Sequence, residues 1–358
     1  MPQTNHKLNL LDFDLPQLKE LIFSWGVPAY RADQVWGWLY RKDVPAIEDM
    51  TNVSATFRGF LDAHSFIGRL TVHTAETSVD GTRKFLFLLP DGSGIESVLI
   101  PERDHLTLCI STQAGCAQGC RFCLTGKSGL RRNLTAGEIV GQVMAVKRIL
   151  EPDQRLTNLV FMGMGEPLAN YDQTLTAIRI LNDPAGIGFA YRRLTLSTSG
   201  LVPQIDRLGQ DTKINLAVSL NASDDDTRSF LMPINRRYPL AELLAACNRY
   251  PLPLTRRITY EYILIKGVND SPQAAHRLAK LLKPATSKIN LIPFNPHSGS
   301  DLVPPDWETV LAFQDILVKR HFTVIIRKSK GGDISAACGQ LQGKIKTLET
   351  QAGFLSVN

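Results

Sequence analysis

The order of hydrophobic and polar positions divides the first hundred residues of this chain into two regions. Three helices are expected where apolar residues recur with helical spacing, at 15–24, 31–40 and 54–66. Three strands are expected where the alternation has a period of two, at 70–77, 82–89 and 95–100. Asp80-Gly81 and Asp91-Gly92, between these strands, are hairpin turn signals. The pattern predicts an N-terminal helical domain over 1–68 and a short antiparallel β lead-in over 69–104.

From residue 106 onward, apolar strand segments alternate with helical segments. Strands are expected at 106–112, 158–162, 193–198, 213–220, 257–264 and 288–293, with a further one at 322–327. Thr135 and Glu138 form a capping box that begins a helix running to about residue 150. Six strand-helix units predict an α/β fold whose core, over 105–345, is an open parallel barrel, followed by a tail over 346–358. The loops at the C-terminal ends of such strands carry the chemistry.

Composition and charge narrow the class of protein only slightly. A hydrophobic content of 44% supports a large core, and a net charge of +6 with a pI near 9.0 favours an anionic partner, nucleic acid included. Basic residues crowd 121–148, where only Glu138 opposes them, and again 327–346. No apolar run reaches membrane-spanning length, and the first 18 residues lack the apolar core of a signal peptide. We therefore expect a cytoplasmic protein without a membrane partner.

Three cysteines carry the strongest chemical signal. Cys116, Cys120 and Cys123 form a CxxxCxxC triplet between the first barrel strand and its helix. Such a triplet can bind three irons of a 4Fe-4S cluster. Because these clusters normally have four thiolate ligands, the fourth iron would take its ligand from another molecule. A structural zinc would need a fourth ligand, and the nearest candidates, His105 and Cys109, are on an expected strand. A disulfide would need an oxidising compartment.

Motifs on both sides of the triplet carry a family resemblance. They are Thr107-Leu-Cys109, Met162-Gly-Met-Gly-Glu-Pro-Leu168, Leu196-Ser-Thr-Ser-Gly200, Met232-Pro-Ile-Asn235, Gly267-Val-Asn269 and Asp333-Ile-Ser-Ala-Ala-Cys-Gly-Gln-Leu341. Together, from Glu96 to about Leu341, the chain resembles the RlmN/Cfr family of radical S-adenosylmethionine (SAM) RNA methyltransferases. The N-terminal helices agree more loosely, chiefly at 30–36. The resemblance implies a partial (β/α)6 radical SAM barrel with one 4Fe-4S cluster, and two SAM molecules used per turnover.

The resemblance also implies a reaction and roles for individual residues. The product would be 2-methyladenosine, at adenosine 2503 of 23S rRNA and adenosine 37 of some tRNAs. Cys338 would carry the methyl group as S-methylcysteine, and Cys109 would release the product through a transient disulfide with Cys338. Glu96 would be the proton acceptor. The residues that match SAM-binding positions are Gly165, Glu166, Ser197, Ser219, Leu220, Asn221 and Asn295.

Two features near these residues add expectations of their own. Asn221 stands where the family usually has histidine, so we expect altered ribose contacts rather than lost binding. The basic residues near Cys338 are expected to increase its thiolate fraction. Gly331 and Gly332 would let the segment around Cys338 move. Cys247, within an expected helix, suits an inert buried cysteine and is assigned no role.

Partners and rival functions complete the set of expectations. The family implies an electron donor such as flavodoxin, and a monomer. One rival is the Cfr subgroup, which methylates C8 of the same rRNA adenosine, although Pro167 and Pro293 look more like the C2 enzymes. The rival from another class is a non-enzymatic, metal-bound RNA-binding module.

Overall fold

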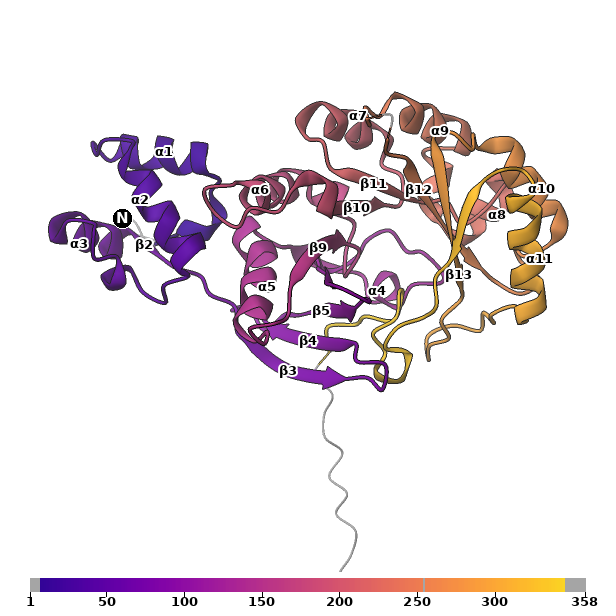
Figure 1. The fold of residues 1–358 in the computed structure, drawn as a ribbon, viewed down its shortest axis with the longest axis horizontal. Helices are drawn as coiled ribbons and strands as arrows, with labels where there is room; N and C mark the ends of the chain where they lie inside the picture. Colours follow the sequence, from indigo (N-terminus) through magenta and orange to yellow (C-terminus); the bar gives the residue numbers. More distant parts are fainter. Residues whose placement is uncertain (1–6, 254, 345–358) are drawn as a thin grey trace, which may run out of the picture.

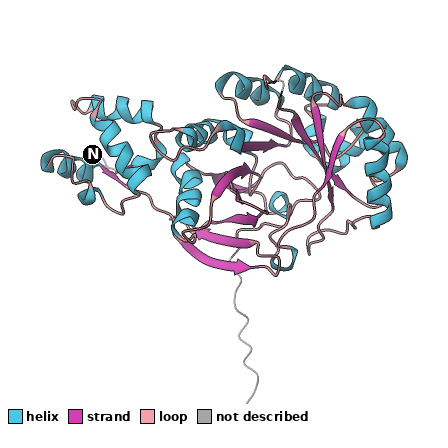
Figure 2. Ribbon diagram, viewed as in Figure 1, coloured by secondary structure: helices cyan, strands magenta, loops and turns pink. Residues whose placement is uncertain are grey.

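The computed structural model describes residues 7–253 and 255–344, and its centre is one ten-stranded sheet with the order β14-β13-β12-β11-β10-β9-β6-β5-β4-β3. Helices surround the strongly curved parallel part of this sheet, and a separate group of N-terminal helices lies to one side (Figures 1 and 2). The fold is therefore mixed α/β with a sheet that is mostly parallel, as the sequence predicted. Among the described residues, no helix combines the length and apolar composition needed to cross a membrane.

The N-terminal helices occur where their periodicity predicted them. They are α1 (Leu15–Ser24), α2 (Arg31–Gly37) and α3 (Ala55–His64). Asp14 begins α1 with a capping box, accepting a hydrogen bond from the backbone of Gln17, whose side chain accepts one from the backbone of Asp14. After α2 the chain continues in a π-helical turn, Trp38–Lys42, where the sequence predicted regular helix. A two-residue parallel pair, β1 (Leu8–Asn9) with β2 (Ser65–Phe66), was not predicted.

The antiparallel strands belong to the same sheet as the barrel. They are β3 (Val72–Thr77), β4 (Arg83–Leu88) and β5 (Gly94–Pro101). β5 pairs with the first barrel strand, β6 (Leu106–Cys109), so that Val98 lies opposite Cys109. The lead-in therefore extends one edge of the barrel.

Within the described residues, seven parallel strands form the barrel, because the further strand predicted near residue 325 joins the other six. After β6 they are β9 (Leu156–Phe161), β10 (Leu194–Thr198), β11 (Asn215–Ser219), β12 (Ile258–Leu264), β13 (Ser287–Pro293) and β14 (Thr323–Ile326). The helices between them are α4 (Leu124–Lys127), α5 (Ala136–Arg148), α6 (Tyr171–Asn182), α7 (Val202–Asp211), α8 (Asp225–Leu231), α9 (Leu240–Arg249), α10 (Pro272–Leu281) and α11 (Trp307–Val318). The predicted capping box at Thr135 begins α5.

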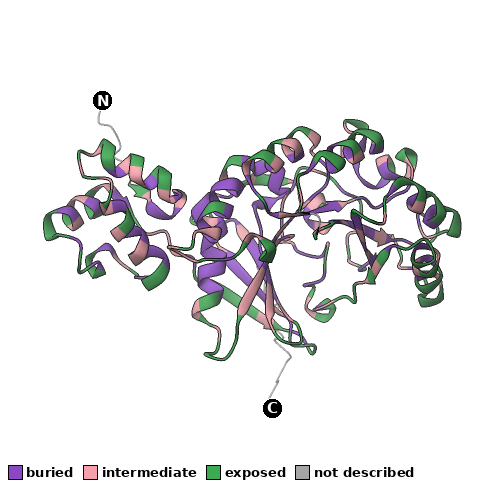
Figure 3. Cartoon of the chain, turned by 45° about the horizontal axis from the view of Figure 1, so that its top comes forward, coloured by how far each residue is buried: buried purple, intermediate pink, exposed green. Residues whose placement is uncertain are grey.

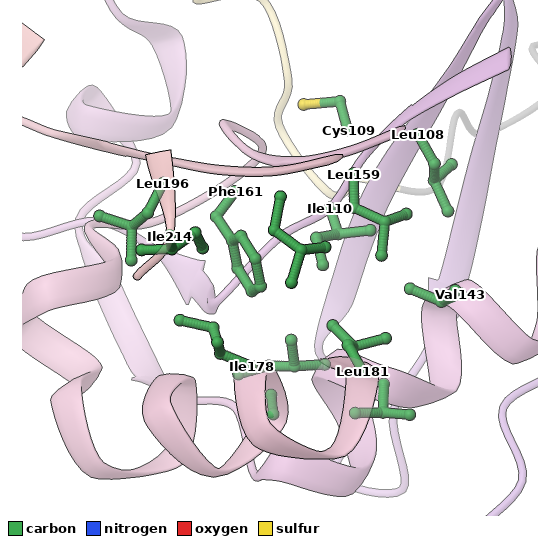
Figure 4. Packing of buried hydrophobic residues seen from close by; sticks show 14 of the residues in the cluster. Leu108, Cys109, Ile110, Val143, Leu159, Phe161, Ile178, Leu181, Leu196 and Ile214 are labelled. Atoms are coloured by element: carbon green, nitrogen blue, oxygen red, sulfur yellow. The ribbon is translucent and has the colours of Figure 1, made fainter. Parts of the chain in front are cut away.

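Alternation along each strand separates the packed core from the barrel interior. Leu108 and Leu159 pack toward α5 and α6, against residues such as Ile178, while the Cys109 sulfur points to the opposite side (Figure 4). The helices keep buried faces toward the sheet and exposed faces outward (Figure 3). Successive side chains of one strand thus point alternately toward the core under the helices and toward the interior of the barrel.

Candidate active site

A short hairpin ties together the two ends of the cysteine loop. β7 (Gln113–Gly115) pairs antiparallel with β8 (Leu130–Asn133), and the backbone N–H of Cys116 donates to the carbonyl of Gly129 at 2.9 Å. Gly115 has φ +84°, and a Cβ there would lie 1.9 Å from the Gly129 oxygen, so no other residue fits without rearrangement. The hairpin, which the sequence analysis missed, holds all three cysteines in one closed loop.

The three cysteines of the triplet line a single cavity. Cys116 and Cys120 are buried, and Cys123 is half-buried. Burial raises the pKa of the Cys116 and Cys120 thiols, and the neighbouring cysteines raise it further. Among the described residues, no three His, Cys, Asp or Glu side chains form a group that could hold a single metal ion. Three thiols that line one cavity are the type of ligand that an iron-sulfur cluster takes.

The cavity lies at the C-terminal ends of the barrel strands and gathers most of the predicted site residues. Those that line it are Cys109, Cys116, Cys120, Cys123, Gly165, Glu166, Ser197, Ser219, Asn221 and Cys338. Glu96, Leu220 and Asn295 do not line it. Residues more than two hundred positions apart in the sequence thus meet at one site.

Gly165 and Glu166 form a rigid corner of this cavity. Gly165 has φ +101°, and a Cβ there would lie 2.6 Å from the Cβ of Gln113. The Glu166 carboxylate accepts hydrogen bonds from the backbone N–H groups of Leu168, at 3.0 Å, and Ser199, at 2.6 Å. Burial raises the pKa of Glu166 although these bonds oppose the rise. A carboxylate with two oxygens keeps lone pairs free for an ammonium group.

Glu261 is a buried carboxylate that the sequence analysis missed. Its Oε2 accepts a hydrogen bond from Ser197 Oγ at 2.6 Å and lies 3.4 Å from Ser219 Oγ. Burial raises the pKa of Glu261, and the hydrogen bond from Ser197 and the charge of Arg327 oppose that rise. A glutamate in the middle of the otherwise uncharged strand β12 was the available signal. Both predicted SAM-binding serines are therefore oriented by one acid.

Leu220 and Asn221 are held by contacts within the protein. Asn221 is buried with φ +58°, a region that asparagine tolerates better than most residues, and its Oδ1 accepts from the backbone of Ile263 at 2.9 Å. Buried Arg228, also missed from the sequence, donates to the carbonyls of Leu220 at 3.1 Å and Ser199 at 2.7 Å. Arg228 thus joins the loops that follow β10 and β11.

Cys109 and Cys338 both line the cavity, and both thiols are free, with Cys109 buried and Cys338 exposed. Although Cys338 as a residue is exposed, the protein atoms packed around its sulfur raise the pKa of the thiol to about 11, and Glu261 adds to this rise while Arg327 opposes it. Arg327 acts in the direction expected of nearby cations, and the expectation that they increase the thiolate fraction of Cys338 stays a prediction. Burial also raises the pKa of Cys109, and the Cys338 sulfur adds to that effect.

Glu96 anchors the segment that carries Cys338, which we call the C-terminal strap (residues 330–343). Its Oε2 accepts hydrogen bonds from the backbone N–H groups of Gln342, at 2.7 Å, and Gly343, at 3.0 Å. Its Oε1 lies 3.3 Å from Lys84 Nζ, which also donates to the carbonyl of Ile334 at 2.7 Å. The structure thus places Glu96 beside the strap and outside the cavity lining.

Two further contacts hold the strap, one at Asp333 and one at Cys338 itself. Asp333 accepts a hydrogen bond from Ser78 Oγ at 2.6 Å, in the turn between β3 and β4. Asn295 Nδ2 donates to the backbone carbonyl of Cys338 at 3.0 Å. The antiparallel lead-in and the loop after β13 therefore position Cys338 together.

The basic residues near the cysteine loop are not all free. Arg132 pairs with Glu138 at 2.7 Å and with Asp91 at 2.6 Å. Arg148 pairs with Asp43 at 2.5 Å. Glu138 is the one acidic residue within 121–148, and the fold adds Asp91 and Asp43 from other parts of the chain as partners.

Comparison with known proteins assigns this architecture to a family. Residues 110–279 match the radical SAM superfamily, and residues 8–67 match the ribosomal RNA large subunit methyltransferase N-terminal domain. The crystal structure of a radical SAM methyltransferase from Sphaerobacter thermophilus has a TM-score of 0.87 and 47% identity, covering 94% of this chain and 100% of that one. The fold and the cysteine site thus define a radical SAM enzyme.

Relatives over nearly the whole length specify the family further. The dual-specificity RNA methyltransferase RlmN of Geotalea uraniireducens is 51% identical over 339 residues, covering 95% of this chain and 98% of the relative. RlmN of Desulfosudis oleivorans is 55% identical over 321 residues, covering 89% of this chain and 86% of the relative. This chain belongs to the RlmN family. That membership argues against the alternative of a non-enzymatic RNA-binding module.

Proposed function

We propose that this protein methylates C2 of adenosine 2503 in 23S rRNA and of adenosine 37 in some tRNAs. The observation that carries the proposal is the meeting of five cysteines at one cavity, three from the triplet loop together with Cys109 and Cys338. The RlmN relatives support RNA as the substrate. Ribosomal and transfer RNA as substrates favour action in the cytoplasm.

The chemistry of C2 explains why a methyl carrier and a radical are both needed. C2 lies between two electron-withdrawing ring nitrogens, so it is too poor a nucleophile to displace the methyl group of SAM directly. A 4Fe-4S cluster held by Cys116, Cys120 and Cys123 would supply the electron that splits SAM into methionine and a 5′-deoxyadenosyl radical. The triplet cysteines line the same cavity as Cys338, so a cluster held by them would supply the radical close to the carried methyl.

Cys338 and Cys109 divide the transfer into steps. Cys338 loses its proton and takes the methyl group of one SAM, which breaks the sulfonium bond and releases S-adenosylhomocysteine. The 5′-deoxyadenosyl radical from a second SAM would take a hydrogen atom from this methyl and become 5′-deoxyadenosine, and the resulting methylene radical would add to C2. The adduct would return one electron to the oxidised iron-sulfur group and give its C2 proton to Glu96. Cys109 then attacks the Cys338 sulfur. The S–CH2 bond breaks, proton uptake completes the new methyl group, and a Cys109–Cys338 disulfide forms and awaits reduction.

The polar residues around the cavity would bind SAM. Glu166 is positioned to accept hydrogen bonds from its amino group, and Gly165 lets the backbone approach. Ser197, Ser219, Leu220 and Asn221 would contact its carboxylate, ribose and adenine. Asn295 would contribute through the strap, since its amide already holds the Cys338 carbonyl. We also propose that the electron donor resembles flavodoxin and that the protein is a monomer. The proposed domain boundaries are those expected from the sequence, at 1–68, 69–104 and 105–345, with a tail over 346–358.

The position of the new methyl group tests the proposed function directly. Anaerobic reconstitution, reduction and incubation with 23S rRNA should yield 2-methyladenosine, identified by mass spectrometry against standards of both methyladenosine isomers. Formation of 8-methyladenosine would assign the protein to the Cfr type of reaction. The absence of any methyladenosine, with intact cluster and SAM cleavage, would overturn the proposal.

Replacing Glu96 by glutamine should slow turnover by about 10²- to 10⁴-fold, because an amide cannot accept the C2 proton. Glutamine keeps an oxygen for the strap N–H groups, so the strap should stay in place. The covalent RNA adduct of Cys338 should accumulate, which denaturing gel electrophoresis with labelled RNA measures.

A Lys84→Met variant is the matched control. It removes the ammonium that lies between Glu96 and Ile334 but leaves the carboxylate available as a base. It should not trap the adduct. Equal trapping in both variants would show that Glu96 acts only by holding the strap, and an unaffected rate in Glu96→Gln would remove Glu96 from the mechanism.

A further inference from the structure

A second cavity meets the first one at the two reactive cysteines. Cys109, Cys338 and Glu261 line both cavities. The second cavity extends toward the N-terminal ends of the barrel strands, where Lys288, near the start of β13, lines it. Its volume of about 480 Å³ lies within the range of small-molecule sites. The interior of the barrel thus has two compartments that share Cys109 and Cys338 in their linings.

The second compartment is rich in cations. Those that line it are Arg192, Arg193, Lys288, Arg327, Lys328 and Lys330. None of the six forms an ion pair with a carboxylate in the part of the chain that the structure describes. Burial lowers the pKa of Lys288, and the charge of Arg327 lowers it further. The arrangement favours an anion, and phosphate groups are the anions that Lys and Arg commonly bind in RNA complexes.

Asn290 is a polar group without a partner inside this compartment. It lines the cavity and pairs in register with Glu261 of β12, and its Oδ1 is buried without a hydrogen bond among the described residues. A buried amide oxygen without a partner is costly unless a ligand satisfies it. Asn290 and Lys288 share one face of β13, and two residues of a strand span about 7 Å. That spacing would allow Asn290 to contact the base and Lys288 to contact the phosphate of one nucleotide.

We propose that the second cavity receives the target adenosine, with Asn290 binding the N6 and N7 edge of the base and Lys288, Arg193 and Arg327 binding phosphates. A carboxamide matches this edge, since its oxygen accepts from the N6 amine and its NH2 donates to N7. This inference rests on the proposed function and assigns the binding mode of its substrate.

The proposed edge also explains why C2 is the carbon that reacts. C2 lies across the purine ring from N6 and N7, so a base held by that edge presents C2 toward Cys109 and Cys338. C8 lies next to N7 and would face the strand instead. Asn290 thus selects both the base and the carbon.

RNA binding to the reconstituted, unreduced enzyme tests the role of Asn290. The probes are a 23S rRNA fragment with its target adenosine and two copies in which purine riboside or 7-deazaadenosine replaces it. Wild-type enzyme should bind each substituted RNA about 5- to 150-fold more weakly, and Asn290→Ala should lose this discrimination. Unchanged discrimination in Asn290→Ala would overturn the inference. Tight wild-type binding of the 7-deaza probe would overturn the assignment of the edge.

Charge variants test the phosphate contacts. Lys288→Gln and Arg193→Gln should weaken binding of all three RNAs equally and reduce the salt dependence of the affinity by ~0.7 per lost contact. Lys266→Gln is the control, because Lys266 follows β12 at the opposite end of the strand and pairs with Asp306. SAM binding should be the same in all three. Equal RNA affinity in Lys288→Gln and the control Lys266→Gln would contradict the assignment of Lys288 to a phosphate.

Failure of this inference and failure of the proposed function are distinguishable. The binding assay needs no turnover, so it reports on Asn290 even if no methyladenosine forms. If the wild-type enzyme produces 2-methyladenosine and Asn290→Ala keeps its discrimination between the RNAs, the proposed reaction is supported and only the proposed binding mode is contradicted.

Discussion

Replacing Cys338 by alanine is expected to abolish RNA methylation, with a loss of roughly 10⁴-fold or more, because no other residue can carry the methyl group. Mass spectrometry of digested RNA measures this loss. SAM cleavage under reducing conditions should persist, since the triplet cysteines remain intact. The two readouts together separate loss of the methyl carrier from loss of the cluster.

Cys247→Ala is the matched control for this experiment. Cys247 is buried in α9 and lines neither cavity. The variant should methylate RNA at close to the wild-type rate. Methylation by Cys338→Ala at a comparable rate would refute the role of Cys338 as carrier.

Replacing Cys123 by alanine is expected to remove both SAM cleavage and RNA methylation. Two thiolates hold a cluster poorly, so the iron and sulfide content of the reconstituted protein should fall as well. Cys123 is only half-buried, whereas Cys116 and Cys120 are buried, so its substitution disturbs packing least. Iron analysis and a SAM cleavage assay measure the effects, and circular dichroism checks the fold.

Different outcomes for the two cysteine variants are the informative result. Cys338→Ala should keep the cluster and cleave SAM, and Cys123→Ala should do neither. A Cys123→Ala protein that still cleaves SAM would contradict the assignment of the triplet.

The local chemistry of the sequence was enough to predict most of the fold. Helix starts followed from capping residues such as Thr135, and strands followed from alternation bounded by turn signals. The parallel order followed because strands alternate with helices. The π-helical turn at Trp38–Lys42 and the β7–β8 hairpin were missed, because long-range packing determines them and short periodicity does not.

The site was predictable only where a motif carried its chemistry. The cysteine triplet can be recognised in the sequence, but the places of Glu261 and Arg228 in the site depend on which strands and loops become neighbours. The place of Asn290 in the second cavity likewise follows from its register beside Glu261.

Electron paramagnetic resonance of the anaerobically reduced protein, with and without SAM, tests the central claim most directly. A cluster bound by three cysteines has one iron open to SAM, so the spectrum of the reduced cluster should change when SAM is added. A spectrum that SAM leaves unchanged, or a protein that contains zinc and no iron, would contradict this account.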